Sequence, residues 1–481
     1  MIGRRWARTA AALLAVAALV TGCATAIDGT GRVNPVGMPV LGSTGGGFDT
    51  EVTSALADVI AFWKTTYPKI ANGAALPPLR GELYSVDGAD LVATRHVPDS
   101  VRQNKCLQRR LTFILDNAAY CQLDDSIIWD RGAGHLLPVL TQQYGTALTA
   151  LVFAHEFGHA VQHRLHIDNT SNIRTIDIES QADCAAGAFA AAALAGRTRL
   201  RITAHDLDRA LSGYFQIRDS TPDTPTDATH GNGFDRINAL QLGIENGATY
   251  CFSPNYLHNR SYTERGYLDR NSRDYLTQGN QSLHEVLGKN GISPDLNRFW
   301  RKAGSSLSKK FGSVRLVRAD HPACGSSQPS SQFGYCPDDN TVYYSSEFAQ
   351  RAYYSITDIV ASKTDASIHL EPNQPGDFAL GLLLAVAWGL AARHQFFGRS
   401  MTDTDALRSA ICYAGAYSED INREFGDQQH PYVLSPPDMD EATSAVLDLV
   451  DLDIAFGSRG TTGLQRVQYF VKGYSGGLAA C

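Results

Sequence analysis

One segment of the chain, residues 151–162, carries two histidines and a glutamate at a spacing suited to metal chemistry. His155 and His159 are four residues apart, so on a helix both imidazoles project from one face, at a separation that one tetrahedral ion can bridge. Glu156 lies beside that face, where its carboxylate can hold a water molecule on the metal instead of binding the ion itself. Apolar residues surround all three, which argues against histidines on a solvated helix surface. The pattern indicates a zinc centre that activates water for hydrolysis.

A second acidic pair follows at a distance that allows a second, antiparallel helix. Glu179 comes 20 residues after His159, which leaves room for a connecting turn of about ten residues. Glu179 can then complete a site of two histidines and one glutamate, with water in the fourth position. Asp183, one turn further along, can accept a hydrogen bond from the distal N–H of a ligand histidine, which fixes its tautomer. The alternative is an exposed helix face, and the histidines upstream favour the metal site over it.

The motifs of this region resemble those of a known family. They read His-Glu-Phe-Gly-His-Ala-Val-Gln at 155–162, Glu-Ser-Gln-Ala-Asp-Cys-Ala-Ala-Gly at 179–187, and then Thr229, His230, Gly231, Arg236, Gly243, Gly247 and Cys251. In this order, over about residues 105–251, they resemble the bacterial neutral zinc metallopeptidases, which are zincins of the gluzincin type. Ser180 and Ala160 depart from the family, which typically has Leu and often has His at these positions. Neither position is expected to touch the metal. The resemblance implies Zn²⁺ as the cofactor and a peptide or protein as the substrate.

Two residues are expected to act in catalysis. Zn²⁺ would lower the pKa of its water, and Glu156 would take the proton as general base and pass it to the leaving amine. By the same resemblance, His230 occupies the place from which gluzincins often send an imidazole to the oxyanion of the tetrahedral intermediate. The alternative for His230 is a loop histidine that caps the helix starting near Gly233.

Two other residues near the motifs invite a metal-binding interpretation that we do not adopt. His163 lies one turn past His159, but it drifts off the metal face toward the helix end, which indicates a surface residue. Cys184 stands beside Asp183 and is interpreted as half of a disulfide. Its counterpart Cys412 lies in a part of the chain that lacks the other ligands.

The second half of the chain repeats features of the first. Four residues of the family motifs have counterparts 230 positions later, namely Arg466, Gly473, Gly477 and Cys481. Other matching blocks keep the same order, such as 157–158 with 388–389 and 203–206 with 435–438. We therefore expect two homologous domains, at 50–255 and 285–481, joined by a polar linker at 256–284.

The expected fold class is α+β, with two tandem zincin-like domains that are mainly helical and carry small β-sheets. In the first domain we expect a helix at 52–67, strands at 83–86, 111–115 and 127–129, and helices near 140–166, 177–195, 204–217 and 231–248. The second domain is expected to be catalytically degenerate. Apolar residues or glycine replace the six polar site positions there: Val386, Ala387, Leu390, Leu407, Ile411 and Gly460. Loss of a metal site to apolar residues indicates a pseudo-peptidase domain, kept for its fold or its surface.

Of the nine cysteines, Cys23 is assigned to lipidation, as described below, which leaves eight. We expect these eight to form disulfides, because an even number of cysteines in an exported chain favours pairing. The simplest connectivity joins neighbours: Cys106–Cys121, Cys184–Cys251, Cys324–Cys336 and Cys412–Cys481. Four cysteines per domain permit three pairings, so the count alone does not decide the connectivity. The expected strand at 111–115 would make the bond between Cys106 and Cys121 a hairpin staple.

The N-terminus has the features of a lipoprotein signal peptide, residues 1–22. A positive region with Arg4, Arg5 and Arg8 precedes an apolar stretch at 10–20, and a lipobox-like sequence then ends at Cys23. Lipidation of Cys23 would anchor the protein to the cell membrane on its extracytoplasmic face, with 23–49 as a flexible linker. The alternative is a plain secretory signal with an incidental cysteine.

The composition fits a globular protein of 481 residues with a net charge of −7 and without a long basic run, so no nucleic-acid partner is expected. Two functions remain. The first is a membrane-anchored, extracytoplasmic zinc peptidase. The second is a non-catalytic binding or assembly lipoprotein that retains a zinc site, an option kept open by the degenerate second copy. Intact Glu156 favours the first, because a purely structural zinc site does not need a general base.

Overall fold

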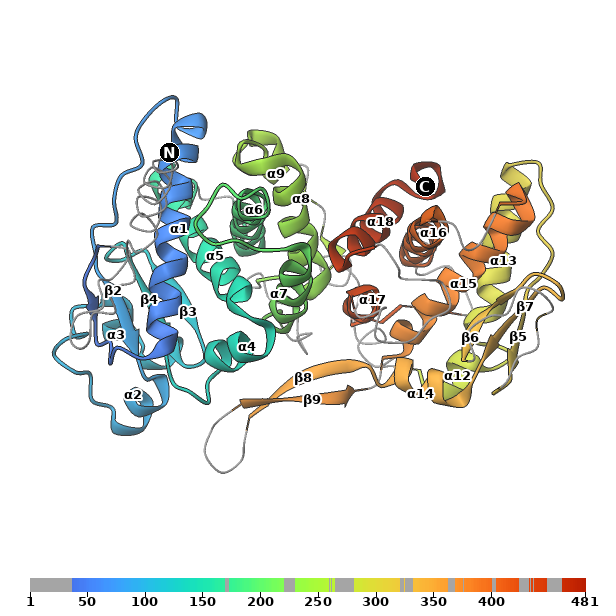
Figure 1. Cartoon of the computed structure of the whole chain (residues 1–481), viewed down its shortest axis with the longest axis horizontal. Helices are drawn as coiled ribbons and strands as arrows, with labels where there is room; N and C mark the ends of the chain where they lie inside the picture. The colour runs from blue at the N-terminus through green and yellow to red at the C-terminus, as the bar shows by residue number, and fades with distance from the viewer. Residues whose placement is uncertain are drawn as a thin grey trace, which may run out of the picture.

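The computed structural model describes residues 37–168, 173–219, 230–258, 260, 262–263, 281–320, 324, 332–361, 368–374, 376–399, 404–423, 432, 434–435, 437–447 and 461–481. Helices with small sheets make up the chain, which is an α+β fold. Figure 1 shows two halves side by side, the first half in blue to green and the second half in yellow to red. The signal peptide expected at 1–22, Cys23 and Gly460 lie outside the described residues.

A four-stranded sheet lies at the outer side of the first half (Figure 1). Its strands are β1 (Val40–Leu41), β2 (Leu83–Val86), β3 (Ala118–Cys121) and β4 (Ser126–Asp130), in the order β1-β2-β4-β3. β4 pairs parallel with β2 and antiparallel with β3. Between β2 and β3 the chain forms α2 (Gly88–Thr94), α3 (Lys105–Arg109) and a 3-10 turn (Leu111–Ile114). β3 is therefore an edge strand, and it faces the helices that carry the candidate site.

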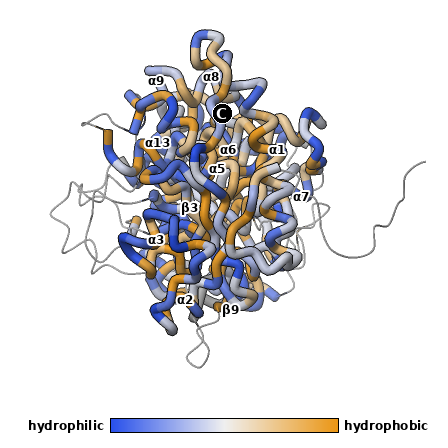
Figure 2. The backbone as a smooth tube through the Cα atoms, turned by 90° about the vertical axis from the view of Figure 1, so that its left-hand side faces the viewer, coloured by the Kyte–Doolittle hydropathy of each residue, from blue (hydrophilic) through white to orange (hydrophobic). Residues whose placement is uncertain are grey.

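The helices of the first half are α1 (Gly47–Ile70), α4 (Leu136–Tyr144), α5 (Thr146–Arg164), α6 (Thr175–Leu194), α7 (Ala204–Gln216), α8 (Gly233–Cys251) and α9 (Pro254–His258). α5 is buried along nearly its whole length and packs against α1, α6 and α7. Figure 2 shows much apolar colour in this central region and a mixture of apolar and hydrophilic colour around α2 and α3. A helix without an exposed face must lie in the core, so polar residues on α5 need partners there.

The elements of the second half mostly correspond to those of the first half, in the same order. They are α12 (Leu283–Leu287), α13 (Ile292–Ser306), β5 (Arg315–Arg318), β6 (Phe333–Cys336), β7 (Thr341–Tyr344), α14 (Ser346–Tyr353), α15 (Asp377–Phe397), α16 (Thr404–Arg423), α17 (Asp438–Leu447), α18 (Gly463–Gly476) and a 3-10 turn (Leu478–Ala480). The sheet order β5-β7-β6 has the pairing directions of β2-β4-β3. An added hairpin, β8 (Ile356–Ala361) with β9 (Ile368–Gln374), stands before α15, where the first half has only Gly145 before α5.

The helix pairs α6/α8 and α16/α18 cross so closely that glycine is required at each crossing. A Cβ atom on Gly243 would lie 1.9 Å from the carbonyl oxygen of Cys184, and one on Gly473 would lie 1.8 Å from that of Cys412. A disulfide also joins α6 to α8, and another joins α16 to Cys481, which follows the last 3-10 turn after α18. The four bonds are those expected from the order of the cysteines: Cys106–Cys121, Cys184–Cys251, Cys324–Cys336 and Cys412–Cys481.

The halves contact each other through α7 and α8 on one side and α17 and α18 on the other (Figure 1). Phe234 packs edge-on against Phe470 and Tyr474, with ring centroids 5.8 and 5.1 Å apart. Asp208 on α7 accepts hydrogen bonds from the first two N–H groups of α18, so the first half caps a helix of the second. Buried apolar side chains form one continuous core through both halves.

Several element boundaries differ from those expected. Residues 111–115, expected as a strand, begin with the 3-10 turn, because Ile114 is buried in a separate cluster of apolar residues and this packing outweighs β-propensity. The disulfide Cys106–Cys121 consequently joins α3 to β3 and does not staple a hairpin. The helix expected at 140–166 is two helices, α4 and α5, because Gly145 has a φ of +93°, which interrupts the helical backbone.

Both expected linkers are partly structured. The linker expected at 23–49 includes β1, which pairs with β2, and the start of α1. The linker expected at 256–284 begins with Tyr256, which is 1% exposed and bonds through its hydroxyl to the carbonyl of Ser180 (2.8 Å). Burial of an aromatic ring fixes this segment against α6. Among the described helices, α15 alone is long and apolar enough to cross a membrane, but 83% of that stretch is buried inside the protein, as in a core helix.

Candidate metal centre

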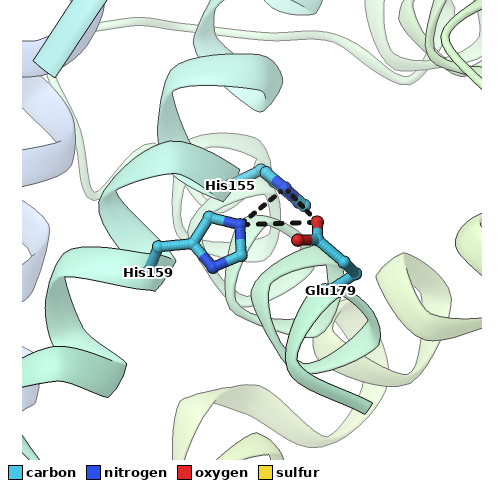
Figure 3. A group of neighbouring side chains, drawn as sticks. All are labelled: His155, His159 and Glu179. Carbon is cyan, nitrogen blue, oxygen red and sulfur yellow. Dashed lines mark hydrogen bonds and ion pairs between the residues drawn. The ribbon is translucent and has the colours of Figure 1, made fainter. Parts of the chain in front are cut away.

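Helices α5 and α6 bring three potential metal ligands together, as Figure 3 shows. The Nε2 atoms of His155 and His159 are 3.1 Å apart, and Oε2 of Glu179 lies 3.2 and 3.4 Å from them. A tetrahedral zinc ion with N and O ligands at about 2.0–2.1 Å would separate its ligand atoms by about 3.3 Å. The three atoms therefore form one face of a tetrahedron of the right size for zinc.

Hydrogen bonds on the far side of each imidazole decide which ring nitrogen faces the centre. Nδ1 of His155 lies 2.7 Å from a carboxylate oxygen of Asp183, and Nδ1 of His159 lies 2.8 Å from Oε1 of Gln162. Both partners are acceptors, since Gln162 uses its Nε2 to donate to the carbonyl of Ile178. Each Nδ1 therefore carries the hydrogen, and each Nε2 presents a lone pair to the centre.

Two lone pairs and a carboxylate within 3.4 Å of one another repel unless a cation lies between them. Oε2 of Glu179 is also buried without a well-oriented hydrogen-bond donor among the described residues. An orphaned carboxylate oxygen at this place is costly in a protein interior unless it coordinates an ion. The residues present thus fit Zn²⁺, which prefers nitrogen and carboxylate ligands in this number.

The charge balance at the centre also favours a cation. Burial lowers the pKa of His155, but Asp183, Glu179 and Glu156 outweigh burial and raise this pKa to about 10. Burial raises the pKa of Glu179, but the two histidines lower it well below its usual range. The negative potential that favours protonated histidines would equally favour a bound divalent cation in place of protons.

Asp183 is completely buried and lies at the centre of a hydrogen-bond network. Besides His155, it accepts hydrogen bonds from the Tyr214 hydroxyl and from two guanidinium nitrogens of Arg236, at 3.1 and 3.2 Å. Burial raises the pKa of Asp183, but Arg236 and His155 lower it below its ordinary value. Asp183 thus stays ionised and holds the His155 ring in one tautomer and one orientation.

Glu156 lies beside the three ligands but is held by the sheet. Its Oε2 accepts a hydrogen bond of 2.8 Å from the backbone N–H of Tyr120 on the edge strand β3. Because successive residues of a helix are about 100° apart, its side chain leaves α5 beside the face of His155. Glu156 also lines the cavity in front of the ligands. In this position the Glu156 carboxylate is better placed to bind a water molecule than to bind the metal ion.

His230, just before α8, lines the same cavity. Its Nδ1 lies 3.1 Å from Oδ1 of Asp219, its backbone N–H donates to the same carboxylate, and its side chain is 57% exposed. The hydrogen bond that the His230 ring donates to Asp219 raises the pKa of His230. The alternative role, as the cap of α8, is not seen, because Asn232 is the N-cap and accepts from the N–H of Asp235.

The cavity has a volume of about 510 Å³. β3 forms one wall with Ala118, Ala119 and Tyr120, and the segment after α7 contributes Arg218 and Asp219. An edge strand beside a cavity leaves backbone N–H and C=O groups that can pair with an extended peptide.

Several residues of the centre were missed by sequence reasoning. Gln162 lies three residues after His159, so its place on the same helix face was open to inference. Tyr214 and Asp219 come from distant segments and carry no local signal. Arg236 was noted only as part of a motif. His163 is partly buried and lies 2.8 Å from a carboxylate oxygen of Asp168, away from the three ligands.

The corresponding places in the second half contain no ligands among the described residues. Val386, Ala387 and Leu390 are buried in α15, and Leu407 and Ile411 are buried in α16, where they pack as core. Comparisons of the chain with family models, with curated proteins and with solved structures give no match. What the centre can do must therefore be inferred from its own geometry.

Proposed function

We propose that the chain is a zinc-dependent peptidase, and that its second half is a degenerate zincin-like copy of the first. The observation that supports this most is the convergence of two histidine lone pairs and an orphaned carboxylate oxygen within 3.4 Å, next to Glu156 in an open cavity. Zn²⁺ bound there would polarise a carbonyl group and lower the pKa of a water molecule.

The protein's own residues have distinct parts in this proposal. Glu156, oriented by the Tyr120 N–H, accepts the proton of the attacking water and passes it to the leaving amine. His230, held by Asp219, donates a hydrogen bond to the negative charge that develops on the carbonyl oxygen. The free edge of β3 favours an extended peptide or protein chain as the substrate. We further propose that lipidation of Cys23 holds the enzyme at the extracytoplasmic face of the membrane.

Metal analysis and a peptide-library cleavage assay on the full chain test the proposal together. One zinc ion per chain is expected, and it should be lost when His155→Ala and His159→Ala are combined. Glu156→Gln keeps the size of the side chain but removes the base, so zinc should remain while cleavage falls by about 100-fold or more. Glu179→Gln should instead weaken zinc binding itself.

His163→Ala is the matched control, because this histidine is on α5 but outside the ligand group. It should keep both zinc and cleavage. Zinc retained by the double histidine variant would refute the site. If Glu156→Gln keeps its zinc and cleaves as fast as wild type, Glu156 is not the general base. If the wild-type chain binds zinc but cleaves no peptide, the non-catalytic binding lipoprotein is favoured.

A further inference from the structure

Three carboxylates lie together in the second half, and none of them belongs to the histidine group of the first half. Asp377, Asp438 and Glu441 are 2%, 0% and 3% exposed, and each offers an oxygen within 4.8 Å of the others. Asp377 begins α15, and the other two are in the first turn of α17, so two helix N-termini meet at the cluster. Helix N-termini tolerate negative charge, but three carboxylates in a dry interior exceed what two helix dipoles stabilise.

The hydrogen bonds that the described residues make to the cluster leave one buried oxygen of Asp377 without a partner. Tyr432 donates to Oδ2 of Asp377 (3.0 Å), Ser435 donates to both oxygens of Asp438, and the Phe378 N–H donates to Oε2 of Glu441 (2.8 Å). Oδ1 of Asp377 is buried without a well-oriented hydrogen-bond donor among the described residues.

Within the described residues, no lysine, arginine or histidine acts as a charged neighbour of the three carboxylates. In this part of the chain, protons or a bound ion can remove or balance their negative charge. Burial raises the pKa of Asp377, and burial together with repulsion from Asp377 raises the pKa of Asp438 and of Glu441. The orphaned Oδ1 of Asp377 repeats the feature found for Oε2 of Glu179 in the candidate zinc centre.

We propose that Asp377, Asp438 and Glu441 bind one divalent cation, and that this cation is Ca²⁺. The three side chains offer only oxygen, which suits a hard cation better than zinc, whose protein sites usually include nitrogen or sulfur ligands. Ca²⁺ accepts an irregular set of protein oxygens at 2.3–2.6 Å, whereas Mg²⁺ requires near-ideal octahedral geometry and keeps several waters. A closed interior site with three carboxylates therefore fits Ca²⁺ better than Mg²⁺.

The position of the site gives the ion a structural role. Asp440, between the two α17 ligands, accepts a hydrogen bond from the Phe234 N–H (3.0 Å) and pairs with Arg218 of the first half (3.2 Å). An ion that fixes the first turn of α17 also fixes this contact between the halves. The proposal does not depend on peptidase activity.

Calcium binding and thermal unfolding of the zinc-loaded full chain test the site. Titration with Ca²⁺ alone should show one ion per chain, and Ca²⁺ at a hundredfold excess over Kd should raise Tm by about 5 °C. The same rise is expected in the variant that combines His155→Ala with His159→Ala, because the two sites share no ligand. Asp438→Asn should weaken Ca²⁺ binding by about tenfold or more.

Asp206→Asn is the matched control for Asp438→Asn. Asp206 bonds to Thr203 at the start of α7 as Asp438 bonds to Ser435 at the start of α17, but it belongs to no carboxylate cluster. It should lower Tm and leave the calcium response intact. Wild-type protein without calcium binding at millimolar Ca²⁺ would overturn the proposal, as would an undiminished response in Asp438→Asn. Should Asp438→Asn fail to fold, Asp377→Asn, which loses the orphaned oxygen but no helix cap, must show the loss of binding.

Discussion

Nδ1 of His155 lies 2.7 Å from the carboxylate of Asp183, and this contact turns the Nε2 lone pair of His155 toward His159 and Glu179. Asp183 is itself held by Arg236 and Tyr214, which come from α8 and α7. The orientation of one candidate ligand on α5 therefore depends on three other helices. A change in any of them is expected to alter metal affinity without touching the ligands.

Asp183→Asn should lower zinc affinity by about 10- to 100-fold. The amide of the asparagine cannot balance the charge of Arg236, so the free energy of unfolding should also fall by about 3 kcal/mol. Metal competition titrations and chemical denaturation measure the two effects. Asp177→Asn, on the same helix and paired with Arg174, should cost stability but leave zinc affinity as it is. Equal zinc loss in both variants would mean that Asp183 acts only through the fold.

Asp219→Asn should shift the alkaline limb of the kcat/KM profile to lower pH. The hydrogen bond that the His230 ring donates to Asp219 raises the pKa of His230, so the protonated imidazole persists to a higher pH than a free one. The pKa of His230 is higher in the folded than in the unfolded chain. The stability that the His230–Asp219 pair contributes is therefore complete below about pH 6.5, and it is lost as the pH rises through the raised pKa. The acid limb should stay in place. An unchanged profile would exclude His230 from catalysis.

Gly243→Ala and Gly473→Ala should separate the roles of the two halves. Each added methyl would meet a carbonyl oxygen, that of Cys184 at 1.9 Å and that of Cys412 at 1.8 Å, so each should destabilise the fold by about 3 kcal/mol. Only the first change displaces α6, which carries Glu179 and Asp183. Zinc affinity should therefore fall in Gly243→Ala alone. A similar fall in both variants would show that the second half also shapes the metal centre.

Asp440→Asn should raise KM with little effect on kcat or zinc content. It removes the charge that faces Arg218, which lines the cavity, but keeps an acceptor for the Phe234 N–H. Arg218, in the wall of the cavity, loses its ion pair with the second half, while the metal ligands on α5 and α6 remain in place. Asp208→Asn breaks another contact between the halves without touching the cavity, so its KM should match wild type.

What the sequence determines about the candidate centre is local. The four-residue spacing of His155 and His159 needs only a helix to place both rings on one face. The order of the cysteines and the repeated glycines also survive in the linear chain, which made the four disulfides and the common order of elements in both halves predictable. These features depend on helical geometry and on positions along one chain, and both can be read without knowing the packing.

The tertiary structure decided the rest. Tyr214, Asp219 and Arg236 reach their partners from segments with no periodic link to α5, and no spacing rule predicts such contacts. Packing also overrode the local preference of residues 111–115 for a strand. The cluster around Asp377 forms only where α15 meets α17, which are separated by 40 residues of chain between Phe397 and Asp438. Side-chain contacts across such distances follow from how the helices stack, which depends on the whole core.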